Sequence, residues 1–96
     1  MGSMTAKLVA NTSIVLREES DSWALLYDPD TGSAYGLNPV GVIIWKHLDG
    51  MHDADGLVEV LRLELNAVPE DVKAHVETFL DDIQKRALAS PGGQVV

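Results

Sequence analysis

The sequence predicts a single α+β domain in which a three-stranded antiparallel meander precedes three helices, in the order βββααα. Apolar, β-branched and aromatic runs over residues 14–16, 23–27 and 33–37 alternate with two polar turns, a pattern typical of consecutive hairpins. At Asn38-Pro39 the pattern changes, and apolar residues then recur at helical spacing. A small sheet with one apolar face needs a cover, and three amphipathic helices are the material available to supply it.

The three expected strands are separated by polar turns at residues 17–22 and 28–32. The second strand places Trp23, Leu25 and Tyr27 on one face, because side chains alternate across a strand. The turn at residues 28–32 reads Asp-Pro-Asp-Thr-Gly. Proline presets φ, aspartate can bond back to the backbone and glycine tolerates positive φ, so this is the strongest turn signal in the chain.

Three helices are expected after the meander. Asn38-Pro39 supplies an N-cap and a first-position proline for the first, and Asp49-Gly50 ends it. Asp53 caps a second helix that runs to about Asn66. Pro69 opens the third and longest helix. Its apolar residues follow the i, i+3, i+4 rule and are Val72, Val76, Phe79, Leu80, Ile83 and Ala87.

The domain is expected to occupy residues 5–90, because a chain of 96 residues has room for one modest core. Residues 1–3 look like an expression scar ahead of Met4. Residues 5–12 carry little pattern and are expected to be a loose lead-in, and residues 91–96 a flexible tail. We see no secretory pattern, and no apolar run approaches the roughly 20 residues that span a bilayer. We therefore expect a cytoplasmic protein.

Charge argues against one broad class of partner. Acidic residues outnumber basic ones by 15 to 7, which gives a formal net charge of −8. Nucleic-acid binders need a basic surface, because contacts to phosphates supply most of their affinity. This chain has the wrong sign for DNA, RNA or an anionic membrane. The charge either keeps the protein soluble or steers a basic partner toward it.

No catalytic or metal-binding pattern stands out. The chain has no cysteine, which excludes thiolate zinc sites, cysteine nucleophiles and cysteine-held iron–sulfur clusters. His47 and His52 could meet near Asp49, Asp53 and Asp55, but their spacing matches no metal motif and capping explains these aspartates. There is no nucleophile elbow and no glycine-rich phosphate loop. We therefore expect no enzyme activity, no metal and no cofactor, and a role in binding a partner.

Residues 25–50 carry four specific motifs: Leu-Leu-x-Asp-Pro-x-Thr-Gly, Tyr-x-Leu-Asn, Gly-x-x-Ile-Trp and Leu-Asp-Gly. Together they resemble the PqqD-like family, the precursor-peptide recognition domains of ribosomal peptide modification pathways. The resemblance extends over about residues 13–88. There are two departures: Gly56 replaces a better helix former, and Ala87 stands near where many relatives carry a glycine.

The resemblance implies a winged helix-turn-helix fold and a non-catalytic peptide chaperone. Such proteins bind the leader of a precursor peptide and present it to a modifying enzyme, often a radical S-adenosylmethionine enzyme; in lasso-peptide pathways the partner is a cysteine protease. In the family the peptide groove lies between the third strand and the third helix, and an open sheet edge can accept an extended peptide as a further strand. Carried to this sequence, the implied peptide-binding residues are Ser33, Ala34, Tyr35, Gly36, Leu37, Val72, His75, Val76, Phe79, Leu80 and Ile83.

Several questions stay open at this point. The sequence does not decide which of these residues face the groove and which the core, and Leu37 and Phe79 could be purely structural. A DNA-binding winged helix is the alternative function, although the second helix has only Arg62 as a basic residue and the third has few. An enzyme lacks any supporting constellation. A scaffold that contacts only the modifying enzyme would differ from a peptide binder in that the isolated protein binds no peptide.

Overall fold

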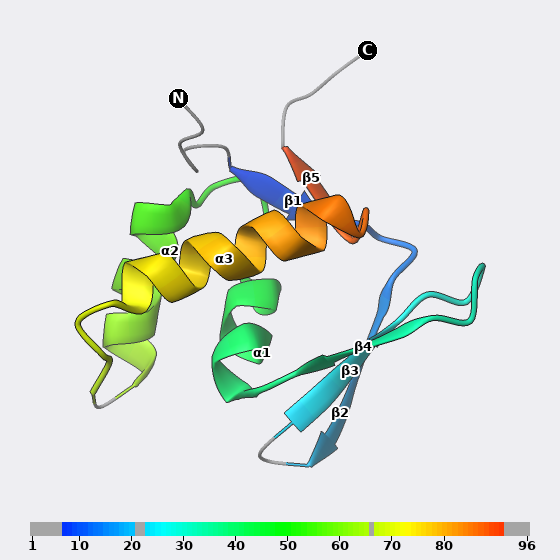
Figure 1. The fold of residues 1–96 in the computed structure, drawn as a ribbon, viewed down its shortest axis with the longest axis horizontal. Helices are drawn as coiled ribbons and strands as arrows, with labels where there is room; N and C mark the ends of the chain where they lie inside the picture. The colour runs from blue at the N-terminus through cyan, green and yellow to red at the C-terminus, as the bar shows by residue number, and fades with distance from the viewer. Residues whose placement is uncertain (1–6, 21–22, 66, 92–96) are drawn as a thin grey trace.

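A computed structural model describes residues 7–20, 23–65 and 67–91, which form two antiparallel sheets and three helices (Figure 1). The α+β class, the three-stranded meander and the three helices after it are confirmed. In chain order the elements are β1 (Leu8–Ala10), β2 (Val15–Ser20), β3 (Trp23–Tyr27), β4 (Ala34–Leu37), α1 (Pro39–Lys46), α2 (Ala54–Glu64), α3 (Val72–Lys85) and β5 (Ala89–Pro91).

The order βββααα is wrong at both ends of the described chain. β1 pairs antiparallel with β5, with Leu8 opposite Pro91, and the two form a separate small sheet. A strand therefore lies inside the expected lead-in 5–12, and Pro91 belongs to β5 and not to a tail. The remainder of the expected tail, 92–96, and the expected scar, 1–3, lie outside the described residues.

Burial explains why these two short strands form. Leu8 and Ala89 are both part of the hydrophobic core, so pairing β1 with β5 places apolar surface against the helices. Pro91 is tolerated in such a short edge strand, because a proline nitrogen carries no hydrogen to donate and an edge strand does not require a ladder bond from every residue. Ala10 N also donates to Leu48 O at 3.0 Å, and this bond fastens β1 to the segment that follows α1.

The meander has the strand order β2-β3-β4, and its turns follow the sequence. At the β3–β4 turn, Asp28 N donates to Ser33 O at 2.9 Å and Gly32 N donates to Asp28 O at 2.7 Å. Gly32 has φ of +77°, so the two residues Gly32 and Ser33 face the single residue Asp28 in a glycine bulge. This turn therefore uses its glycine for a backbone conformation that other residues rarely adopt.

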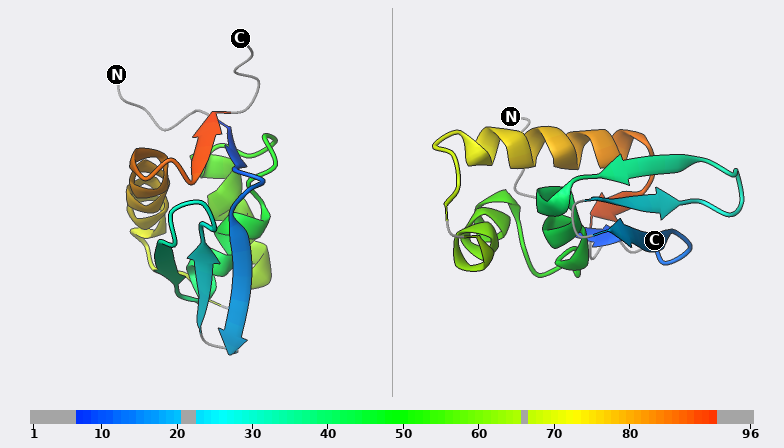
Figure 2. Two further views of the ribbon diagram at one scale, coloured as in Figure 1. Left: turned by 90° about the vertical axis from the view of Figure 1, so that its right-hand side faces the viewer. Right: turned by 90° about the horizontal axis from the view of Figure 1, so that it is seen from below.

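The core lies between one face of this sheet and the helices. Ala24 and Leu26 of β3 belong to this core, and so does Trp45 of α1. The opposite face of β3 exposes Trp23 and Tyr27. Figure 2 shows α3 on the β4 side of the sheet, with β2 on the far side. None of the helices in the described ranges is long and apolar enough to cross a bilayer.

The N-terminal caps of α1 and α2 agree with the capping signals, whereas α1 ends at Lys46, before the Asp49-Gly50 that was expected to end it. Asn38 Oδ1 accepts from Gly41 N at 2.8 Å at the start of α1. Asp53 Oδ1 accepts from Gly56 N at 2.8 Å at the start of α2, which ends at Glu64; the expected end, Asn66, lies outside the described residues. α3 begins at Val72, three residues beyond the proline expected to open it, and ends at Lys85.

Candidate binding groove

A groove with a volume of about 480 Å³ runs between α3 and the corner where β4 passes into α1. Apolar side chains form much of its lining, and polar side chains of α3 stand along its rim. The apolar members are Val40, Ile44, Val76 and Phe79, and the polar ones include His75, Thr78, Asp81, Asp82 and Lys85. Tyr35, Asn38 and Gly41 complete the lining on the β4–α1 side.

The eleven residues that the family resemblance suggested fall into three groups. Five are core residues with 0% to 4% of their surface exposed: Leu37, Val72, Val76, Leu80 and Ile83. Of these, Val76 also reaches the groove lining. Two, Tyr35 and Phe79, are half-buried and line the groove. Four are exposed, and these are Ser33, Ala34, Gly36 and His75.

The division on α3 follows from helix geometry. Val72, Val76, Leu80 and Ile83 lie on one strip at i, i+4 and i+3 spacing, and this strip faces the core. His75, Phe79 and Asp82 form the neighbouring strip, and it faces the groove. Of the two residues that the sequence left open, Phe79 lines the groove and Leu37 lies in the core.

Sequence reasoning missed the β4–α1 corner and the polar rim of α3. The sequence predicts a helix cap at Asn38 and a helix after it, and it gives Asn38, Val40 and Ile44 no role in the groove that they line. Their position directly after the expected strand was the signal in the sequence that could have indicated a place at the groove. Asp82 lies 47 residues from Tyr35, the side chain that it contacts, and no local pattern could have joined the two.

Tyr35, Asp82 and Arg86 form a compact cluster at the groove. Tyr35 Oη donates to Asp82 Oδ2 at 2.6 Å. Arg86 Nε lies 3.2 Å from each oxygen of Asp82, and its guanidinium carbon lies 4.8 Å from the centre of the Tyr35 ring. The ring centres of Tyr35 and Phe79 are 6.4 Å apart. The cluster therefore ties the last strand of the sheet to the last turn of α3.

The electrostatics of the cluster keep the hydroxyl proton on Tyr35. Burial, together with the hydrogen bond to Asp82, raises the pKa of Tyr35 to about 12. The hydrogen bond from Tyr35, and then the nearby Arg86, lower the pKa of Asp82 from its ordinary value of 3.8. Tyr35 is therefore a neutral donor and Asp82 a charged acceptor over the whole physiological range.

The register of β4 shows which backbone groups are open. Asp28 N bonds to Ser33 O across the turn, and bonded pairs alternate with non-bonded pairs along an antiparallel ladder. Two residues further along, Leu26 therefore forms a bonded pair with Tyr35. The N–H and C=O groups of Tyr35 consequently point toward β3.

The intervening residues of β4 point the other way. Ala34 and Gly36 form the non-bonded pairs with Tyr27 and Leu25, so their N–H and C=O groups point to the free edge of the sheet. Both residues are exposed, and an added Cβ on Gly36 would meet nothing within 4 Å. The edge beside the groove is thus open along two consecutive outward-facing residues.

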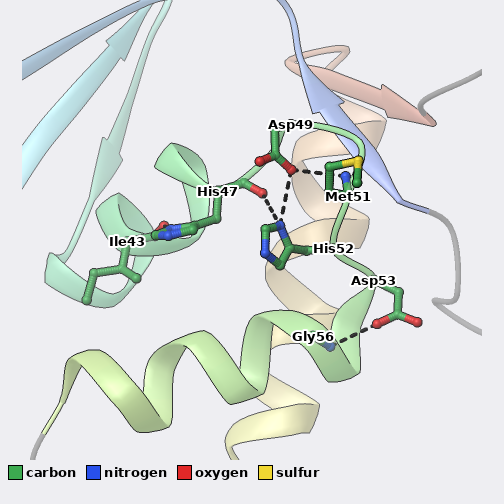
Figure 3. A network of polar contacts seen from close by, with 7 residues as sticks. All are labelled: Ile43, His47, Asp49, Met51, His52, Asp53 and Gly56. Carbon is green, nitrogen blue, oxygen red and sulfur yellow. Dashed lines mark hydrogen bonds and ion pairs between the residues drawn. The ribbon is translucent and has the colours of Figure 1, made fainter.

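The two histidines considered for a metal site do lie together, as Figure 3 shows. Their ring centres are 5.6 Å apart and the rings are nearly perpendicular, at 87°. His47 Nδ1 lies 2.9 Å from Ile43 O. His52 Nδ1 lies 3.2 Å from His47 O and 3.1 Å from Asp49 Oδ1. These contacts fasten the end of α1 to the segment that leads into α2.

The aspartates around these histidines have structural partners. Asp49 Oδ1 accepts from Met51 N at 3.0 Å, and Asp53 caps α2. Asp55 pairs with Lys73 of α3 at 2.9 Å. Within the part of the chain that the structure describes, no group of three or more His, Asp or Glu side chains is placed to hold a metal ion.

Comparison with known proteins identifies the family. One solved structure, described as TbiB1 in complex with the TbiA(beta) leader peptide, shares the fold with a TM-score of 0.66 and 22% sequence identity. The match covers 92% of this chain and 99% of that one. No curated protein matches the chain. The family model described as coenzyme PQQ synthesis protein D (PqqD) matches residues 24–89, which is more than half of the sequence, and the chain therefore belongs to the PqqD family.

Proposed function

We propose that this protein binds the leader of a ribosomally made precursor peptide in the groove between β4 and α3 and presents it to a modifying enzyme. The observation that carries the proposal is the open backbone of Ala34 and Gly36 directly beside an apolar groove. TbiB1, which shares the fold, is described in complex with a leader peptide. Family membership supports the same role. It also favours a winged helix-turn-helix description of the fold.

An extended peptide would add to β4 as a further strand. Backbone bonds to Ala34 and Gly36 supply affinity that does not depend on the peptide's sequence. Alternate side chains of the added strand turn inward over the groove, where Phe79 and Ile44 offer apolar contact. Affinity and selectivity thus come from different parts of the site.

The chemistry is assigned to the partner enzyme. In this proposal the chain contributes no catalytic residue and positions the peptide only. The partner is a radical S-adenosylmethionine enzyme or, in a lasso-peptide pathway, a cysteine protease that removes the leader. In this arrangement the protein must hold the peptide and leave much of it accessible to the enzyme. A peptide bound along a single edge strand meets this requirement.

The charge pattern counts against the DNA-binding alternative. The net charge is −8, and three basic side chains, two on α3 and one at its C-cap, already have acidic partners. Lys73 pairs with Asp55 at 2.9 Å, Lys85 with Asp81 at 3.0 Å, and Arg86 with Asp82 at 3.2 Å. A recognition helix needs such side chains for phosphates and bases, so this helix is poorly suited to DNA.

The test is a calorimetric titration of the protein with the precursor peptide encoded beside its gene. We compare Ala34→Pro with Ala34→Val as a matched pair at one site. The N–H of Ala34 points to the free edge, so proline is tolerated there in the free protein but removes one bond to the peptide. Valine keeps that bond. One hydrogen bond is worth about 1 kcal/mol, so proline should weaken binding about five-fold relative to valine.

Two results would overturn the proposal. No binding at millimolar peptide, which is a free energy weaker than about −4 kcal/mol, would remove the peptide role and favour the scaffold alternative. Equal affinities for the proline and valine variants, with circular dichroism showing both folded, would mean that the peptide does not add to β4.

A further inference from the structure

Tyr35 stands between two hollows along β4. The groove of about 480 Å³ lies on one side, toward Asn38 and Ile44. A second hollow of about 300 Å³ lies on the other side, toward the β3–β4 turn, and is lined by Ser33 and Arg86 among others. Within the described chain, Tyr35 is the residue that lines both hollows. Its ring therefore separates them.

Contacts from both hollows hold the Tyr35 side chain between them. Asp82, which accepts the Tyr35 hydroxyl at 2.6 Å, lines the first hollow. Arg86, which stacks over the ring at 4.8 Å, lines the second. The ring could not turn aside without losing a short charge-assisted hydrogen bond and a cation–π contact. Tyr35 thus forms a fixed bridge from β4 to α3 between the two hollows.

The strand register connects this bridge to a bound peptide. With Ala34 and Gly36 offering the edge bonds, the peptide residues opposite Ser33, Tyr35 and Leu37 turn their side chains inward, because directly opposed residues share a face. Inward side chains are two residues apart, roughly 6.6 Å along the strand. The outer two of the three face the two hollows, and the middle one faces the ring of Tyr35.

We propose that the cluster of Tyr35, Asp82 and Arg86 is a divider that selects extended peptides by spacing. The selected peptide has two inward side chains four residues apart, one for each hollow, with a small residue midway between them. The inference rests on the proposed function and deepens it by naming a pattern in the substrate. Small here means glycine, alanine or serine, since the bridge occupies the space that a larger side chain needs.

The linings predict anchors of different size for the two hollows. The first hollow is the larger and takes an apolar side chain, because Val40, Ile44 and Phe79 are among the residues that line it. The second hollow is smaller, and Leu26 and Leu88 line it together with Asp28, Thr31, Ser33 and Arg86. It takes a smaller side chain. The order of the two anchors along the peptide depends on whether the added strand runs parallel or antiparallel to β4.

The test needs no knowledge of the natural peptide. A displayed library of random ten-residue peptides is selected on the immobilised protein, and the enriched sequences are aligned. An enriched peptide with glycine at the midway position and the same peptide with leucine there are then titrated. We expect the wild type to prefer glycine about ten-fold, and Tyr35→Ala to reduce that preference below about three-fold. Tyr27→Ala, a tyrosine on the outer face of β3, should leave the preference unchanged and serves as the matched control.

A gentler variant guards against loss of fold. Tyr35→Phe keeps the ring but loses the bond to Asp82, so the bridge loosens and the preference for glycine should shrink in the same direction. A ten-fold preference retained in both Tyr35→Phe and Tyr35→Ala, or no preference in the wild type, would overturn the divider while leaving peptide binding intact. If the library yields no peptide that binds the wild-type protein, the proposed function is overturned, and the inference with it.

Discussion

The two neighbouring strips of α3 differ in what they contact, although both contain apolar residues. Val76 and Leu80 belong to the strip that closes the core. Phe79 and Asp82 belong to the strip that borders the groove, and Phe79 is only half-buried. Phe79 and Leu80 are adjacent in sequence yet lie on different surfaces. One helix thus both completes the fold and borders the site, and apolarity alone does not separate the two roles.

The largest expected effect compares these two adjacent residues. Leu80→Ala removes a side chain that is 1% exposed and should lower the free energy of unfolding by about 2 to 5 kcal/mol, because a cavity remains where the core cannot close. Phe79→Ala should cost about 1 to 2 kcal/mol, because that side chain still meets water in the groove. Urea unfolding followed by circular dichroism measures both.

Peptide binding should rank the two variants in the opposite order. At a temperature where both are folded, Phe79→Ala should weaken the peptide about ten-fold or more, as an apolar contact in a binding groove does. Leu80→Ala should leave affinity nearly unchanged. If the two variants lose stability equally and lose affinity equally, the two strips are not distinct.

A medium effect is expected where α3 ends. Ala87 has φ of +61°, a conformation that costs an L-residue about 1 to 2 kcal/mol and that glycine adopts freely. Ala87 directly follows Arg86, the C-cap of α3. Glycine is the preferred residue at the position after a C-cap. After allowing for the extra flexibility of glycine in the unfolded chain, Ala87→Gly should raise the free energy of unfolding by about 0.5 to 1 kcal/mol.

Ala74→Gly is the matched control for this change, since Ala74 is exposed within α3. There the same substitution should destabilise the protein by about 1 kcal/mol. Thermal melts of both variants would show opposite shifts. Shifts of the same sign would mean that the left-handed backbone at residue 87 is not strained.

The smallest expected effect is a pH dependence of stability that comes from Tyr35 and Asp82 at the groove. The folded-state pKa of Tyr35 is raised from 10.0 to about 12, so its contribution to stability is present below pH 10 and is lost as pH rises toward 12. The pKa of Asp82 is lowered from 3.8, so its contribution is present above that pH and is lost as pH falls below it.

Urea midpoints measured from pH 3 to 12 would test both limbs. Tyr35→Phe removes the titrating hydroxyl and should flatten the alkaline limb. It also removes one partner of Asp82, so the acid limb should become shallower. An alkaline limb unchanged in Tyr35→Phe would mean that other groups cause it.

Most of the fold could be predicted because its signals are local. The turn at residues 28–32 and the caps Asn38 and Asp53 each fix a boundary within a few residues, and the structure shows the expected bonds at all three. β1 and β5 carry no such signal. Each has three residues, and each is a strand only because the other lies opposite it.

The site could be predicted only in outline, for the same reason. A stripe of Val, Phe, Leu and Ile predicts a buried helix face, but burial depends on what packs against each residue, and that is set by elements distant in sequence. Tyr35 shows the limit clearly. Its place on an edge strand was predicted, whereas its bond to Asp82, and hence its position between two hollows, exists only once α3 has docked.

The pairing of β1 with β5 also has a consequence for the order of folding. Leu8 meets Pro91, so this sheet closes a loop of 91 − 8 = 83 residues, whereas each turn of the meander and each helix joins near neighbours. Loop-closure entropy and contact order place such a contact late, after the hairpins and helices have formed. Because β5 follows α3 directly, α3 should already lie across the sheet when the ends of the described chain meet. Leu8→Ala should then speed unfolding and barely slow folding, which stopped-flow kinetics would show.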